Sequence, residues 1–125
     1  MRYFVISLLA AVVLPVSTAS ALTAKEAKAC QAMAATFGPK KAEFDGLVTR
    51  RDALVIEVEE AGDVWEAAEA LRNFSAGHAA EADAKKTVYD EAVKEFDRVE
   101  QAYRVTGAQL NEDFAAYNAK CAIED

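Results

Sequence analysis

The chain has 125 residues, of which 53% are hydrophobic, and its formal net charge is −7 at pH 7. An acidic chain without a clustered basic patch is a poor candidate for binding nucleic acid or an anionic membrane surface, because both require Lys and Arg to neutralise phosphate. The length allows one domain, and a domain this small often needs a covalent cross-link or a partner to be stable.

Residues 1–21 have the layout of a cleavable secretory signal peptide. Arg2 supplies a positive charge, an apolar run covers residues 5–16, and small residues lead up to Ala21. The apolar run is too short to remain as a membrane anchor. We therefore predict that residues 22–125 form one mature domain that is periplasmic or secreted, with 13 basic and 21 acidic residues and hence a net charge of −8.

Two classes of membrane-attached protein are not expected. A lipoprotein would carry a cysteine directly after the small residues, and the nearest cysteine, Cys30, lies well beyond them. No second apolar stretch in the sequence predicts a membrane span.

The two cysteines, Cys30 and Cys121, lie near the two ends of the mature chain. An exported protein with an even number of cysteines is normally oxidised, so we predict a disulfide between them. Free thiols or a shared metal ion are less favoured, because the sequence has no C-x-x-C spacing and no histidine near either cysteine.

Helical signals begin directly after the predicted cleavage site. Thr23 and Glu26 have the spacing of a capping box, and an Ala-rich helix is predicted over residues 24–36. Gly38 and Pro39 then predict that this helix stops and that a second helix begins with a fresh first turn.

The second predicted helix runs from about Pro39 to Asn73. Steps of three and four residues predict its contact seam, which consists of Phe44, Leu47, Arg51, Leu54, Val58, Ala61, Trp65 and Ala68. A turn should follow at residues 73–78, with Asn73 in the left-handed conformation and Ser75 capping the next helix.

A third helix is predicted over residues 76–122. Every seventh position from Ala82 gives its seam, which is aromatic or apolar throughout: Ala82, Tyr89, Phe96, Tyr103, Leu110 and Tyr117. The common phase of the three tyrosines favours core packing over a stacking ladder for a ligand. The sequence therefore predicts an all-α fold, a long antiparallel helical hairpin resembling a coiled coil.

The disulfide determines how the first helix is placed. In a hairpin about a turn near Ala76, the numbers of facing residues add up to about 152, so Cys121 faces about residue 31. This brings it to Cys30 only if the short N-terminal helix continues in line with the first arm beyond a kink at Pro39. A helix folded back on the hairpin would hold the cysteines farther apart than the roughly 7 Å between Cα atoms that a disulfide allows, unless the third helix bends sharply at Gly107. Gly46 is expected opposite Gly107, where small residues would ease the approach of the two arms.

Several apolar residues lie beside the seams. They make the apolar face of each helix wider than one neighbouring helix can cover. We predict that a further surface is buried, either by a partner protein or by self-association. Phe114 lies beside the seam, and Trp65 is more readily explained as core than as a binding hot spot. The possible interaction surface comprises Val55, Ile56, Val64, Trp65, Val88 and Val93.

Three polar features have simple structural explanations. His78, the single histidine, lies at the predicted turn without visible catalytic partners, so we expect a solvated residue. Arg51 occupies a seam position and should either reach Glu100 or extend its guanidinium outward into solvent. The third feature is an acidic run that we interpret as a solvated face, partly paired across the hairpin with Lys85, Lys86 and Lys94, and not as a calcium site: Glu57, Glu59, Glu60, Asp63, Glu66 and Glu69.

No nucleophile elbow, phosphate-binding glycine loop, haem-attachment motif, zinc spacing or di-iron motif occurs. We expect no enzyme, and we assign no catalytic, cofactor or metal residues. The function that the sequence favours is an exported protein acting through protein–protein interaction, as an adaptor, a chaperone-like holder or an inhibitor. The alternative is a small-molecule or cation binder, formed when hairpins associate into a four-helix bundle.

Overall fold

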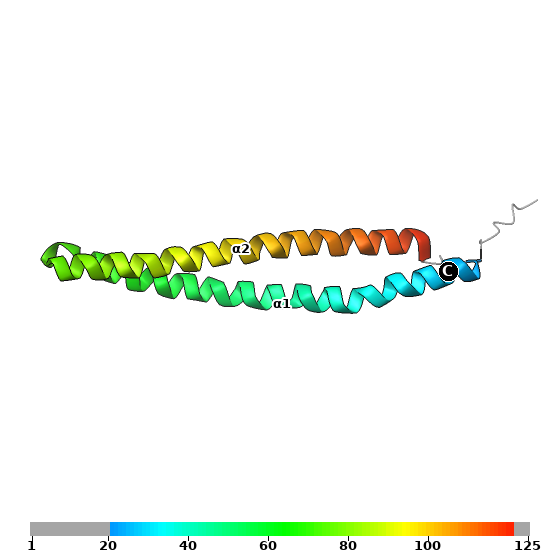
Figure 1. Ribbon diagram of the computed structural model, residues 1–125, viewed down its shortest axis with the longest axis horizontal. Coiled ribbons are helices and arrows are strands. Elements are labelled where there is room, and N and C mark those ends of the chain that lie inside the picture. The colour runs from blue at the N-terminus through cyan, green and yellow to red at the C-terminus, as the bar shows by residue number, and fades with distance from the viewer. Residues whose placement is uncertain (1–20, 122–125) are drawn as a thin grey trace, which may run out of the picture.

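The computed structural model describes residues 21–121, and this part of the chain folds into one long antiparallel helical hairpin (Figure 1). Helix α1 spans Ala24–Glu69 and helix α2 spans Ala76–Cys121, and each has 46 residues. A short 3₁₀ helix, η1 (Arg72–Phe74), joins them. Each arm is about 70 Å long at a rise of 1.5 Å per residue. The predicted all-α hairpin is confirmed, whereas the predicted signal peptide, apart from Ala21, lies outside the described residues.

The N-terminus of α1 is held by the predicted capping box. The backbone N–H of Glu26 donates to Oγ1 of Thr23 at 3.2 Å, and the backbone N–H of Thr23 donates to Oε2 of Glu26 at 2.7 Å. This second hydrogen bond is the main cause of a lowered pKa of Glu26. The start of the first helix is therefore confirmed.

The predicted break at Gly38 and Pro39 is wrong, because α1 continues through both residues as one helix. Pro39 lacks a backbone donor and its ring crowds the preceding turn, which costs about 3 kcal/mol in a helix interior. Packing on both sides of the proline offsets this cost: Phe37 stacks on Phe114 and Phe44 stacks on Tyr103, with ring centroids 4.4 and 5.1 Å apart. Figure 1 shows that α1 changes direction in its cyan part, around residue 40. The predicted in-line arrangement is confirmed, but its two segments form a single bent helix.

The two arms keep one register over most of their length. In five facing pairs the residue numbers add up to 151, close to the predicted 152: Cys30 with Cys121, Phe37 with Phe114, Phe44 with Gly107, Arg51 with Glu100, and Gly62 with Tyr89. The first four pairs follow each other at steps of seven residues, and the last comes after a step of eleven. The constant sum shows that the register of the two arms does not shift between Cys30 and Gly62.

The disulfide between Cys30 and Cys121 is confirmed. Its Cα atoms are 5.7 Å apart, and it joins residues separated by 91 positions in the sequence. Closing a loop of this size stabilises the fold by about 4 to 5 kcal/mol in the chain-entropy model. The bond therefore fixes the open end of the hairpin, opposite the turn (Figure 1).

The hydrophobic core is small and lies between the two helices. Four residues of the described chain are buried apolar side chains, namely Leu54, Ala82, Val99 and Leu110. The other large seam residues stay partly exposed because each helix has only one neighbour to cover it. The hairpin is thus stabilised mainly by the contacts between its two helices and by the disulfide.

The close approach of the arms at Gly107 differs from the prediction. Gly46 has open space where a side chain would be, so it does not lie opposite Gly107. Gly107 instead accommodates the ring of Phe44, whose Cε2 atom lies 3.0 Å from the place of a Cβ at position 107. A large aromatic residue therefore packs into the gap left by a glycine, in place of two glycines facing each other.

The turn contains no residue in the left-handed conformation. Asn73 belongs to η1, and no residue between 21 and 121 has a positive φ, so the predicted left-handed Asn73 is wrong. A tight 3₁₀ turn satisfies the backbone instead, with the N–H of Phe74 donating to the carbonyl of Leu71 at 3.0 Å. Ser75 is extended and caps α2 as predicted, since its Oγ accepts the backbone N–H of His78 at 3.2 Å.

Candidate functional site

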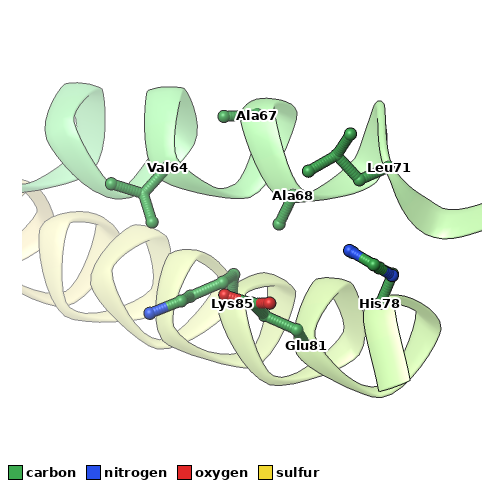
Figure 2. A pocket seen from close by; sticks show the side chains of 7 residues that line it. All are labelled: Val64, Ala67, Ala68, Leu71, His78, Glu81 and Lys85. Carbon is green, nitrogen blue, oxygen red and sulfur yellow. The ribbon is translucent and has the colours of Figure 1, made fainter. Parts of the chain in front are cut away.

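One flank of the hairpin, next to the turn, is hollowed by an apolar groove. The hollow nearest the turn has a volume of about 350 Å³, and Figure 2 shows its lining residues: Val64, Ala67, Ala68, Leu71, His78, Glu81 and Lys85. A second hollow of about 280 Å³ adjoins it and shares two of these residues; its lining is Glu57, Glu60, Ala61, Val64, Lys85 and Val88. We call the residues of the two hollows together the tip groove.

The sequence produces this groove by placing large apolar residues beside the seam and small ones next to them. Val64 lies on α1, and Leu71, seven residues later, lies in the turn just after α1; both line the hollow nearest the turn. Both are about half exposed, at 49% and 45%, and Val88 on α2 is 55% exposed. The small side chains of Ala67 and Ala68 line the same hollow as Val64 and Leu71.

The two helices form the two walls of the groove. Figure 2 shows Val64, Ala68 and Leu71 on the α1 wall, with the ring of His78 pointing from α2 toward Leu71. The side chain of Lys85 runs along the α2 wall below Val64. Its aliphatic stem adds apolar surface, and it is the one Lys or Arg among the lining residues.

His78 belongs to the wall of the groove and to the cap of α2. Its Nδ1 lies 2.8 Å from Oγ of Ser75, the same oxygen that accepts its backbone N–H. The ring is half-buried, where the sequence predicted a solvated residue. Within residues 21–121 no carboxylate is hydrogen-bonded to His78, so the contact with Ser75 is a capping interaction.

The rim of the groove is acidic. Glu57 is paired with Arg50 at 2.6 Å, but none of the ion pairs within residues 21–121 involves Glu60 or Glu81. The remaining carboxylates of the predicted acidic run, apart from Glu69, likewise have no ion pair in this part of the chain. The negative charge of this region is therefore largely uncompensated by the protein itself.

The predicted pairing of the acidic run with lysines across the hairpin is wrong. Lys86 pairs with Asp90 on its own helix at 2.7 Å, and neither Lys85 nor Lys94 forms an ion pair with a described residue. A partner one turn away on the same helix is closer than one across the apolar seam. The ion pairs that do cross the hairpin near the middle and the turn are those of Arg51 with Glu100 and of Arg72 with Asp83.

Arg51 and Glu100 interact as predicted. The Arg51 guanidinium donates from Nε to the carboxylate of Glu100, and it lies 5.5 Å from the centre of the Tyr103 ring. Hydrogen bonds from Arg51 and then Arg104 lower the pKa of Glu100. A similar cross-link at the turn raises the pKa of Arg72, mainly through its hydrogen bond to Asp83.

The structure separates the six residues of the predicted interaction surface. It brings Val64 and Val88 together in the tip groove. Val55 lies at another hollow, lined with Val58, Glu59 and Phe96. Val93 is half-buried, whereas Ile56 is exposed and lines none of these hollows.

Trp65, the remaining residue of that surface, belongs to the seam. Its ring stacks on Tyr89 with centroids 5.2 Å apart, and Nζ of Lys86 lies 5.5 Å from the ring centre. Its Nε1 is buried and has no hydrogen-bond partner among the described residues. The side chain is thus held by packing, not by polar contacts.

The sequence analysis missed two exposed residues near the turn, Leu71 and Phe74. Leu71 was placed at the end of a helix, although its spacing of seven from Val64 is the signal that could have assigned it to the same face. Phe74 is the most exposed of the large apolar side chains in the described chain, and its ring centre lies 6.1 Å from that of His78. The apolar surface therefore extends from the groove to the turn itself.

This arrangement can hold apolar side chains between acidic rims. Across residues 21–121, no group of three or more His, Cys, Asp or Glu side chains is placed to hold a metal ion, and neither helix is long and apolar enough to cross a membrane. No protein-family model, curated protein or solved structure matches the chain.

Proposed function

We propose that this chain is an exported, non-enzymatic protein that acts by binding another protein through its helical faces. The observation that carries the proposal is the tip groove, where Val64, Leu71 and Val88 each leave about half of a large apolar side chain in water. Contiguous apolar surface with a polar rim is typical of protein-interaction sites. The signal-like N-terminal sequence and the disulfide support an oxidising compartment outside the cytoplasm.

The shape of the hairpin favours binding over catalysis. Enzymes need polar groups that converge in an enclosed pocket, whereas the tip groove is lined mainly by apolar and acidic side chains and lies open on the flank of two helices (Figure 2). A rigid arm of about 70 Å places this surface far from the disulfide. An adaptor, a chaperone-like holder or an inhibitor would each use such a projecting arm.

The test is capture of a partner by the oxidised chain of residues 22–125 from an extract of its own export compartment. We expect one protein in stoichiometric amount, and a complex of defined mass by light scattering after chromatography. A control bait carrying Val64→Gln and Val88→Gln should capture less of it. If the oxidised chain captures no stoichiometric partner, the proposal fails. If that chain is itself an oligomer of two or more hairpins, the self-associated four-helix bundle takes its place.

A further inference from the structure

We propose that the tip groove binds a basic amphipathic helix of the partner, with an apolar stripe facing the groove and Lys or Arg on both sides of that stripe. The inference rests on the proposed function, and it narrows the partner to one class of chemistry. Three features of the groove carry it: its length, its floor and its charge.

The groove has the length of a short helix. Its lining extends from Glu57 on α1 to Leu71, in the turn just after α1, a span of about 20 Å at 1.5 Å per residue. A bound helix of about 14 residues would match this span, with anchors at positions i, i+3 or i+4, and i+7. Such a helix would pack against α1 and α2 together and complete a three-helix arrangement over the exposed flank.

The floor of the groove allows close approach. Apart from glycine, alanine has the smallest side chain, and three alanines line the groove. Ala67 and Ala68 lie between Val64 and Leu71, and Ala61 lies one turn before Val64. The distance between packed helices, about 8 to 10 Å, depends on the side chains at the contact. Apolar anchors of the incoming helix would therefore fit between Val64 and Leu71.

The charge of the groove selects a basic partner. Residues 52–69 of α1 contain seven acidic residues and no basic one. The groove itself is lined by three glutamates and one lysine, and two of these glutamates, Glu60 and Glu81, have no ion pair among the described residues. Charge complementarity at the rim gives specificity and suppresses partners of like charge.

The same charge disfavours a second copy of this chain as the occupant. Two grooves placed face to face would bring two acidic rims together, on molecules that each carry a net charge of −7. Like charges opposed at an interface cost free energy and slow association. Self-association through this flank is therefore an outcome that the experiment must be able to detect.

Three synthetic peptides of about 16 residues would test the inference. The first has a leucine stripe at helical spacing with Lys and Arg elsewhere, the second has the same composition in scrambled order, and the third keeps the stripe but replaces the basic residues with Glu. Each is titrated into the oxidised chain of residues 22–125 and followed by fluorescence anisotropy. We expect the first peptide to bind at least about tenfold more tightly than either of the others, a difference well within the resolution of the method.

Matched variants would locate the site. Val64→Gln and Val88→Gln remove apolar side chains of the groove, and Ile56→Gln and Val105→Gln remove side chains that line none of the hollows and are similarly exposed, at 57% and 51%. We expect the groove variants to weaken binding of the first peptide about tenfold and the controls to change it less than about twofold. Thermal unfolding of all four variants checks that the hairpin is intact.

A second variant set tests the charge. Glu60→Gln with Glu81→Gln should reduce the preference for the basic over the acidic peptide, whereas Glu43→Gln, on a distant part of α1, should leave it unchanged. Equal binding of the striped and scrambled basic peptides, or equal loss in groove and control variants, overturns the groove as the site. Equal binding of the basic and acidic striped peptides overturns the charge assignment.

The failure of this inference can be told apart from the failure of the proposed function. A captured natural partner that binds Val64→Gln and Val88→Gln as tightly as the unchanged chain overturns the groove assignment and leaves the proposed function standing. Dimers of the unchanged chain that dissociate in the two groove variants show the second copy as the occupant, and this overturns the basic helix. Absence of any captured partner contradicts the proposed function itself.

Discussion

The ring of Phe44 packs directly over the backbone of Gly107, with its Cε2 atom 3.0 Å from the place that a Cβ would occupy. Gly46, two residues along the same helix, has no neighbour within 4 Å of its own missing Cβ. The two glycines therefore differ in how much space a side chain would find at each position. At position 107 the absence of a side chain allows the ring of Phe44 to pack against the helix. At position 46 no neighbouring group occupies the space that a side chain would fill.

This difference predicts that replacing each glycine by alanine changes the stability of the hairpin differently. Gly46→Ala should stabilise the hairpin by up to about 1 kcal/mol, because alanine is the better helix former and the site is open. Gly107→Ala gains the same helix propensity but crowds Phe44, so we expect it to be less stable than Gly46→Ala by about 1 kcal/mol or more. Urea unfolding of both variants measures this difference, and equal stabilities would show that the Phe44 ring moves away freely.

Pro39 leads to a second prediction, since it interrupts the backbone ladder inside α1. Pro39→Ala restores one hydrogen bond and removes the ring that crowds the preceding turn, so we expect stabilisation of about 1 to 3 kcal/mol. Urea unfolding in the presence of a reductant isolates this effect from the disulfide. A variant no more stable than the unchanged chain would mean that the bend itself improves the packing of Phe37 and Phe44.

The third prediction concerns the disulfide. Replacing Cys30 and Cys121 by serine should lower the free energy of unfolding by about 4 kcal/mol. The loss should be uneven along the hairpin, because the buried residues Leu54 and Ala82 lie in the half of the hairpin that ends at the turn, away from the bond. Hydrogen exchange would then show faster exchange at the open end, and equal exchange along both arms would contradict this.

The fourth prediction is a pH dependence that arises from Glu100. Hydrogen bonds from Arg51 and Arg104 hold its folded pKa below the ordinary value of 4.5. A depressed carboxylate pKa stabilises the fold above the unfolded pKa, and this contribution is lost as the pH falls through the folded pKa. Glu100→Gln should therefore be less stable than the unchanged chain at pH 7 and should lose less stability on acidification below about pH 4.5.

Thermal unfolding of both proteins as a function of pH measures this dependence. Glu43→Gln is the matched control, because Glu43 has no ion pair among the described residues. If Glu100→Gln and Glu43→Gln respond to acid in the same way, the ion pair with Arg51 contributes nothing to folding.

Much of the fold was predictable because long-range constraints agreed with each other. The seam of seven-residue steps from Ala82 and the two cysteines require the same register, and the structure has that register to within one residue. Local signals were less reliable. Gly38 and Pro39 favour a helix end, but aromatic packing on either side keeps α1 continuous. The turn at Asn73 likewise follows backbone hydrogen bonding, not the local preference of asparagine.

The candidate site was only partly predictable. Val64 and Val88 were identified because they lie beside the seam, yet the sequence could not show that they share one flank and that Val55 lies at a separate hollow. Which of the residues beside the seam share a flank depends on how the two helices cross, and residue spacing alone does not determine this crossing. The acidic residues of the rim could be identified from the sequence. That most of them have no ion pair could be seen only once the structure gave the positions of the lysines.

The bond between Cys30 and Cys121 also closes a covalent ring, which consists of the disulfide and the backbone from one cysteine to the other. The arms are connected twice, once through the turn and once through sulfur. A protease that cuts the backbone beside the exposed Phe74 would therefore open the ring without releasing either arm. The product would be a two-chain molecule of nearly unchanged mass, held by the sulfur bridge at one end and by the seam along its length, and it would separate into halves only when reduced and unfolded.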